Sequence, residues 1–240
     1  MRSLYLISFI SFISIISFGQ SKKKLKNTAQ VCFDLKNYVC AEEALLKALK
    51  QDSTDHFLLN NLGVVQRRLN KPQEALISFS KVLELIPDDI FALNNKAGVL
   101  ILFKDYENAL YLLNKAHQKS SFNETTLLLR ATVYRHLKNP EAALSDLKNI
   151  LQIKPNDFVA RANMALLKKE QGDSVNAKSD FILLLTERPK DIISINALAE
   201  IELTNKNFQS ALDYTDKAIG IDSEYANAYT TRGRIRLYMG

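Results

Sequence analysis

The sequence of 240 residues contains no tryptophan, seven glycines, five prolines and two cysteines. So little glycine and proline is atypical of collagen-like, linker and disordered chains. There is also no sustained alternation of β-branched residues, which disfavours a fold built from strands. Since 47% of the residues are hydrophobic and 24% are charged, the chain has the composition of an ordinary globular protein.

The sequence also lacks the common motifs of catalytic, metal-binding and nucleotide-binding sites. The three histidines do not lie in an H-E-x-x-H pattern, and there is no phosphate-binding G-x-x-x-x-G-K-[ST], no G-x-G-x-x-G and no G-x-S-x-G. His136, beside Arg135, is expected to be solvated or packed. The net charge of +6 is dispersed, with no zinc-finger spacing and no arginine-rich run among aromatics. We therefore expect no enzyme activity, cofactor, bound metal or nucleic-acid partner.

The N-terminus is distinct from the rest of the chain. Arg2 precedes an uncharged, largely apolar run that ends at Ser21, and small residues occupy positions −3 and −1 of the Gly19–Gln20 bond. This pattern predicts a signal peptide over residues 1–19 and a mature protein outside the cytosol, periplasmic or secreted. The alternative is an uncleaved anchor. The run is near the lower length limit for a bilayer span, and the four lysines between residues 22 and 26 disfavour translocation.

A period of 34 residues starts at Lys22 and continues without an insertion to Tyr225. Alanine fills the twentieth position of every window: Ala41, Ala75, Ala109, Ala143, Ala177 and Ala211. Small residues fill the eighth position: Ala29, Gly63, Ala97, Ala131, Ala165, Ala199 and Gly233. We expect two helices per window, over positions 1–14 and about 18–31, that cross closely at these small residues. Stacked pairs would share one continuous core.

The segment "NNLGVVQRRLNKPQEALISFSKVLELIPDD" resembles the tetratricopeptide repeat, a helix–turn–helix unit of 34 residues with small eighth and twentieth positions. The resemblance implies an all-α fold, an α-solenoid with a right-handed superhelix. It covers residues 20–225 as six repeats, with a first helix of a seventh repeat or a capping helix over 226–240. The six repeats are 22–55, 56–89, 90–123, 124–157, 158–191 and 192–225. The aromatic expected early in the first helices is mostly absent.

The resemblance also implies a binding surface, because first helices of this family line a concave face with positions 2, 5, 6, 9, 12 and 13. Asparagine recurs at positions 5 and 6, and each side-chain amide can both donate to and accept from the backbone of an extended peptide. The candidate peptide-binding residues are Asn27, Asn60, Asn61, Asn94, Asn95, Asn163, Asn196, Phe57, Phe91, Val64, Ile101, Arg67 and Arg135. The alternative is that asparagine merely tolerates exposure there.

These features predict a non-enzymatic scaffold or adaptor outside the cytosol that binds a peptide or protein segment. The alternative is a sensor or accessory arm of a longer protein, truncated after Gly240. An exported enzyme would need a site that the sequence does not show. The clamp that some family members use for a C-terminal carboxylate is not expected. Of its five positions, only Lys26 and Asn61 carry a fitting residue; the unsuitable three are Gln30, Gly98 and Leu102.

The two cysteines, Cys32 and Cys40, are placed on the two helices of the first repeat. An exported protein can oxidise them to a disulfide, provided that their Cα atoms lie within about 7 Å. Otherwise both would serve as small hydrophobic residues. The sequence leaves these alternatives open.

Overall fold

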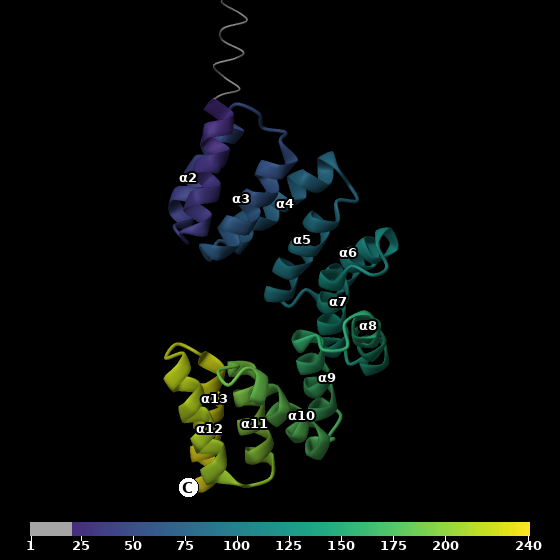
Figure 1. The fold of residues 1–240 in the computed structure, drawn as a ribbon, viewed down its shortest axis with the longest axis vertical. Coiled ribbons are helices and arrows are strands. Elements are labelled where there is room, and N and C mark those ends of the chain that lie inside the picture. The colour runs from purple at the N-terminus through teal and green to yellow at the C-terminus, as the bar shows by residue number, and fades with distance from the viewer. Residues whose placement is uncertain (1–20) are drawn as a thin grey trace, which may run out of the picture. The chain divides into compact units, whose positions relative to one another are not determined.

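The computed structural model describes residues 21–240 (Figure 1). The predicted signal peptide and its cleavage site therefore lie outside the described residues. Every regular element in the described part is an α-helix, which confirms the all-α prediction. A first helix covers residues 21–34. It is followed by α2 (Tyr38–Leu49), α3 (His56–Arg68), α4 (Pro72–Leu85), α5 (Ile90–Leu102), α6 (Tyr106–Lys119), α7 (Glu124–His136), α8 (Pro140–Ile153), α9 (Phe158–Glu170), α10 (Ser174–Glu187), α11 (Ile192–Thr204), α12 (Phe208–Ile221) and α13 (Ala226–Met239).

Side-chain caps and one special backbone position fix where the helices begin and end. Asp89, at the end of its window, caps α5 by accepting from the Ala92 backbone N–H at 2.7 Å. Pro72 and Pro140 occupy the first positions of α4 and α8, where a missing N–H costs nothing. The residue at position 15 of each window has a left-handed φ that ends the first helix. These residues are Lys36, Asn70, Lys104, Lys138, Gly172 and Lys206.

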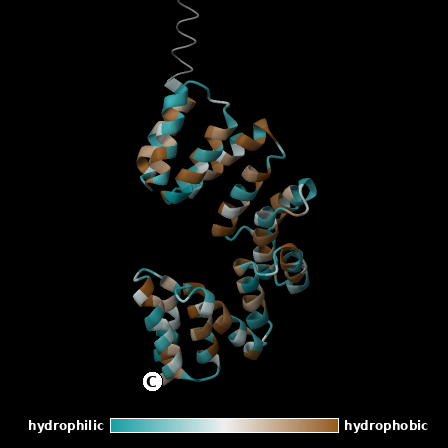
Figure 2. Ribbon diagram, in the orientation of Figure 1, coloured by the Kyte–Doolittle hydropathy of each residue, from teal (hydrophilic) through white to brown (hydrophobic). Residues whose placement is uncertain are grey.

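The contacts divide the chain into two compact units, unit 1 up to Leu129 and unit 2 from Arg130, with the boundary inside α7. In unit 1, α3 packs on α2, α4 and α5; in unit 2, α11 packs on α9, α10, α12 and α13. Each of these first helices thus contacts both the second helix of its own hairpin and the first helix of the next. Figure 2 shows hydrophobic and hydrophilic residues interspersed along the helices, as expected when each helix buries one face.

Small residues lie at the helix crossings, as predicted. The alanines at position 20 of all six windows are fully buried. At position 8, Gly63 faces the ring of Phe79 so closely that an added Cβ would lie 2.5 Å from Cε1. The buried residues form separate clusters, such as Ala75, Phe79 and Val99. A core continuous from one unit to the other stays a prediction.

A disulfide joins Cys32 to Cys40 and so links the helix over 21–34 to α2, with Cα atoms 5.8 Å apart. Of the two alternatives for these cysteines, the structure takes the oxidised one. Cys32 is buried beside Ala29 and Leu45. Within residues 21–240 there is no helix with the length and apolarity needed to cross a membrane, and no group of three side chains that could ligate a metal ion.

Two charged pairs link neighbouring helices of unit 2: one joins α7 to α8 within a hairpin, and the other joins α10 to α11, the first helix of the next hairpin. Arg130 donates to both carboxylate oxygens of Asp146, at 2.8 and 2.6 Å, and the Asp146 side chain is only 3% exposed. Glu202, 4% exposed, pairs with Lys178 at 2.5 Å and accepts from Asn207 at 2.8 Å. Burial by itself would raise the pKa of Glu202, but the hydrogen bonds from Lys178 and Asn207 outweigh it and lower that pKa.

Candidate peptide-binding site

Three side-chain amides lie at position 6 of successive first helices in unit 1. They belong to Asn27 on the helix over 21–34, Asn61 on α3 and Asn95 on α5. Asn27 and Asn61 are exposed and have no hydrogen-bond partner among the described residues. Asn95 accepts from Arg67 Nη1 at 3.4 Å and leaves its NH₂ group undonated. We call the surface formed by Asn27, Asn61 and Asn95, together with Val64 and Arg67, the amide face.

A pocket of about 360 Å³ opens on this face between the helix over 21–34 and α3. Its polar members include Asn27 and Asn61, and most of the others are apolar. The lining residues are Lys26, Asn27, Ala29, Gln30, Phe33, Leu45, Leu58, Asn61, Val64 and Val65. An apolar pocket beside unpaired amides can take an apolar side chain of an extended segment while the amides bond its backbone.

The four apolar candidates differ in how they are placed. Val64 lines the pocket, and Ile101 is half-buried on α5. Phe57 and Phe91, at position 2 of α3 and α5, are 67% and 74% exposed. Large aromatic side chains this open are available to a partner, because burying them would remove much apolar area from water.

The structure does not place Asn94 and Asn196 on an open surface, since their residues are only 5% and 6% exposed. Asn94 accepts from Thr126 Oγ1 at 3.0 Å and donates to Asn123 Oδ1 at 3.3 Å. Position 5 therefore points towards the next first helix, and its amide joins neighbouring repeats. This differs from the expectation that positions 5 and 6 share the binding surface.

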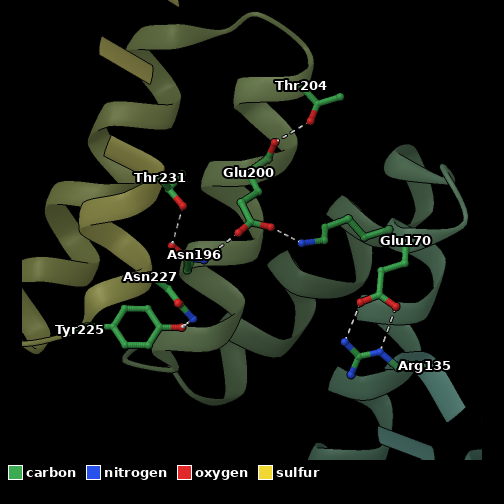
Figure 3. A network of polar contacts seen from close by, with 9 residues as sticks. Arg135, Glu170, Asn196, Glu200, Thr204, Tyr225, Asn227 and Thr231 are labelled. Carbon is green, nitrogen blue, oxygen red and sulfur yellow. Dashed lines mark hydrogen bonds and ion pairs between the residues drawn. The ribbon is translucent and has the colours of Figure 1, made fainter. Parts of the chain in front are cut away.

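The other two asparagines at position 5 agree with this reading. Asn196 accepts from Thr231 on α13 at 3.4 Å and donates to Glu200 at 3.2 Å (Figure 3). Asn60 is half-buried and donates to Asp89, the cap of the next first helix, at 3.4 Å. Both amides are thus engaged within the protein and not presented for a ligand.

Asn163, at position 6 in unit 2, is also occupied. It donates to the Val159 carbonyl at 2.9 Å and accepts from Arg135 Nη1 at 3.2 Å. Arg135 in turn donates to both carboxylate oxygens of Glu170, at 3.1 and 2.7 Å (Figure 3). Burial, the largest single influence, would raise the pKa of Glu170. The hydrogen bonds from Arg135, together with the positive charges of Arg135, Lys169 and Lys138, lower that pKa overall. Among the asparagines at position 6, those of unit 1 keep amide groups that have no partner among the described residues, whereas the amide of Asn163 is bonded on both sides.

Gln30 and Phe33 are among the pocket residues that are absent from the predicted binding set. They stand at positions 9 and 12, which the repeat pattern assigns to the binding surface, so the signal was present in the sequence. The pairing of Lys26 with Asp55, at 2.7 Å, has no such signal. This ion pair engages Lys26, the one cation that fits the C-terminal carboxylate clamp, and the absence of the clamp stays a prediction.

Among sequence families, the tetratricopeptide repeat model matches residues 58–89. Mouse sperm-associated antigen 1 is 29% identical over 102 residues, which make up 42% of this chain and 11% of that protein. Human tetratricopeptide repeat protein 16 is 24% identical over 153 residues, 59% of this chain and 18% of that protein. The chain thus spans less than a fifth of the length of these curated relatives.

Solved structures resemble the chain over more of its length. A tetratricopeptide repeat protein from Parabacteroides merdae is 29% identical with a TM-score of 0.77, and the match covers 92% of this chain and 87% of that one. YrrB, described as a TPR protein with an unusual peptide-binding site, is 24% identical with a TM-score of 0.54, covering 80% and 100%. Pseudomonas aeruginosa pilF is 19% identical with a TM-score of 0.68, covering 90% and 99%. The last two likenesses concern the fold alone, and together the three support an α-solenoid.

Proposed function

Because the chain belongs to the tetratricopeptide repeat family, we propose that it is a non-enzymatic scaffold whose amide face binds an extended peptide segment of a protein partner. Repeats of this family generally serve protein–protein interaction. The observation that carries the proposal is the row of Asn27, Asn61 and Asn95 beside the pocket. Two of these amides have no partner among the described residues, and in the third, Asn95, only the oxygen is bonded. A peptide backbone running along them would find donors and acceptors at the spacing of the first helices.

The test uses position 6 in both units. Asn61→Ala and Asn95→Ala are each expected to weaken peptide binding by about 1–3 kcal/mol, because backbone groups of the peptide lose their partners. Asn163→Ala is the matched control, since its amide is already bonded to Val159 and Arg135. The probe is a fluorescent library of decapeptides with blocked termini, and binding is followed by anisotropy. Equal binding by all three variants and the unaltered chain would contradict the proposal.

The proposed location is outside the cytosol. The apolar N-terminal run before Gln20 supports export, and the disulfide between Cys32 and Cys40 suits an oxidising compartment. Mass spectrometry of the N-terminal peptide of the protein isolated from its source should find Gln20, or pyroglutamate formed from it, as the first residue. Recovery of a chain that starts at Met1 would favour the anchor instead.

A role as an accessory arm of a longer protein is the second candidate. It is favoured by one observation: the matched segments make up only 11% of the length of mouse sperm-associated antigen 1 and 18% of human tetratricopeptide repeat protein 16. Sequencing of the full transcript or gene region distinguishes the two candidates. A reading frame that continues past Gly240 into another domain would support the arm.

A further inference from the structure

Arg67 on the amide face lacks the acidic partner that its counterpart in unit 2 has. Arg67 and Arg135 occupy position 12 of their windows. Arg135 binds Glu170, which stands at position 13 of the following repeat, through two hydrogen bonds. In unit 1 the equivalent position holds Leu102, whose side chain is 64% exposed. Arg67 forms no ion pair with any residue that the structure describes, and its hydrogen bond goes to the neutral amide of Asn95.

Arg67 is an exposed residue, and one side of its guanidinium lies close to a neighbouring helix. It lies against α5, where an added Cβ at Gly98 would be 3.5 Å from Nη1. Burial, and after it the neighbouring Arg68, lower the pKa of Arg67, although an arginine stays charged at neutral pH. An exposed guanidinium that has no carboxylate beside it can pair with a carboxylate that a partner supplies. A carboxylate that reached it would gain the charge-assisted, two-pronged geometry that Arg135 and Glu170 already display.

We propose that Arg67 binds a side-chain carboxylate of the partner segment, so that unit 1 selects extended peptides with an internal glutamate or aspartate. The proposal rests on the proposed function, because the peptide is held by the same amides. Asn61 and Val64 precede Arg67 on its own helix, and Asn95 lies beside it on the next. A peptide that uses the amides on both sides must continue past Arg67 in both directions. The carboxylate therefore belongs to a residue within the segment and not to its C-terminus.

Two peptide libraries test the selection. Both are fluorescent decapeptide libraries with amidated C-termini; one has glutamate fixed at its fifth position, the other has glutamine there, and neither has any further acidic residue. We expect the unaltered chain to bind the glutamate library at least tenfold more tightly. Arg67→Gln should abolish that preference, whereas Arg68→Gln should retain most of it. A third library, with glutamine at the fifth position and a free C-terminal carboxylate, should bind no better than the amidated glutamine library.

Leu102→Glu is the sharpest variant, because it supplies unit 1 with the acid that Glu170 provides in unit 2. It should weaken binding of the glutamate library at least tenfold and leave the glutamine library unchanged, since the new carboxylate occupies Arg67. Leu102→Gln is its matched control and should keep the preference. Leu102 is exposed, so both variants are expected to fold, which circular dichroism verifies. If either does not, the Arg67→Gln result decides.

The outcomes separate this proposal from the one on which it rests. Equal binding of the glutamate and glutamine libraries, with loss in Asn61→Ala, would overturn acid selection and keep the peptide-binding scaffold. Preferential binding of the library with the free C-terminus would overturn the side-chain assignment. Binding of none of the libraries would overturn both proposals.

Discussion

Replacing Gly63 by alanine tests whether side-chain size at position 8 sets the distance between paired helices. The added Cβ would lie 2.5, 2.6 and 2.9 Å from three ring carbons of Phe79, and Phe79 is fully buried. The ring is rigid and enclosed, so the two helices must move apart. Gly233 stands at the same position of α13, where an added Cβ would have no atom within 4 Å.

Two effects of opposite sign decide the result. Alanine favours a helix interior over glycine by about 1 kcal/mol, whereas overpacking a filled core costs about 1–3 kcal/mol. Because the contact distances at Gly63 are far below van der Waals separation, we expect the second effect to win and Gly63→Ala to lower the free energy of unfolding by about 1 kcal/mol. At Gly233 only the first effect acts, so Gly233→Ala should raise stability by up to about 1 kcal/mol.

The measurement is urea denaturation combined with native-state hydrogen exchange of α3 and α4, because repeat arrays often unfold in more than two states. In a Phe79→Leu background Gly63→Ala should cost nothing, since the third repeat carries Ala97 and Leu113, both fully buried, at the same two positions. The difference between the two backgrounds is the coupling energy of the contact. If Gly63→Ala stabilised the chain as much as Gly233→Ala, the close contact would not govern this crossing.

Three further perturbations address the charges and the disulfide. Asp146→Ala should cost about 3–5 kcal/mol, because it leaves Arg130 without its buried carboxylate, whereas Asp216→Ala, at an exposed pair, should change the urea midpoint little. The pKa of Glu202 is lower in the folded state than its ordinary value of about 4.3, so ionised Glu202 stabilises the fold above that value. This stabilisation is lost as the pH falls through the pKa of the folded state. Glu202→Gln should therefore show a smaller loss of stability when the pH is lowered. Reduction of the disulfide, which closes a short loop of sequence separation 8, should lower the stability of the first hairpin by about 2–3 kcal/mol and add two hydrogens to the mass of the chain.

Much of the fold follows from the period of 34 residues alone. Small residues at positions 8 and 20 predict where helices cross, and observed second helices such as α4 begin one residue before the predicted start. The left-handed residue at position 15 was not predicted, because four of its six occupants are lysine, whose side chain gives little sign of that conformation.

The candidate site was predicted less well, because its availability depends on partners that sequence position does not reveal. Asn61 and Asn163 share position 6, yet only Asn163 has both sides of its amide bonded. Similarly, Arg67 and Arg135 share position 12, but only Arg135 has an acidic partner. That partner, Glu170, lies in the following repeat, where the equivalent residue for Arg67 is Leu102. Such differences depend on contacts between helices, so the residues at one repeat position cannot reveal them.

Paired asparagines at positions 5 and 6 have different surroundings, because successive residues of a helix point about 100° apart. Asn94 is buried and bonded to Thr126 and Asn123, so Asn94→Ala should cost about 1–3 kcal/mol of stability by leaving those groups unpaired. Asn95 is half-buried and bonded only to Arg67, through a bond of 3.4 Å, so Asn95→Ala should change the free energy of unfolding little while it weakens peptide binding. Urea denaturation and peptide anisotropy of the two variants should therefore give opposite patterns. A loss of stability in Asn95→Ala equal to that in Asn94→Ala would mean that position 6, like position 5, serves to join the repeats.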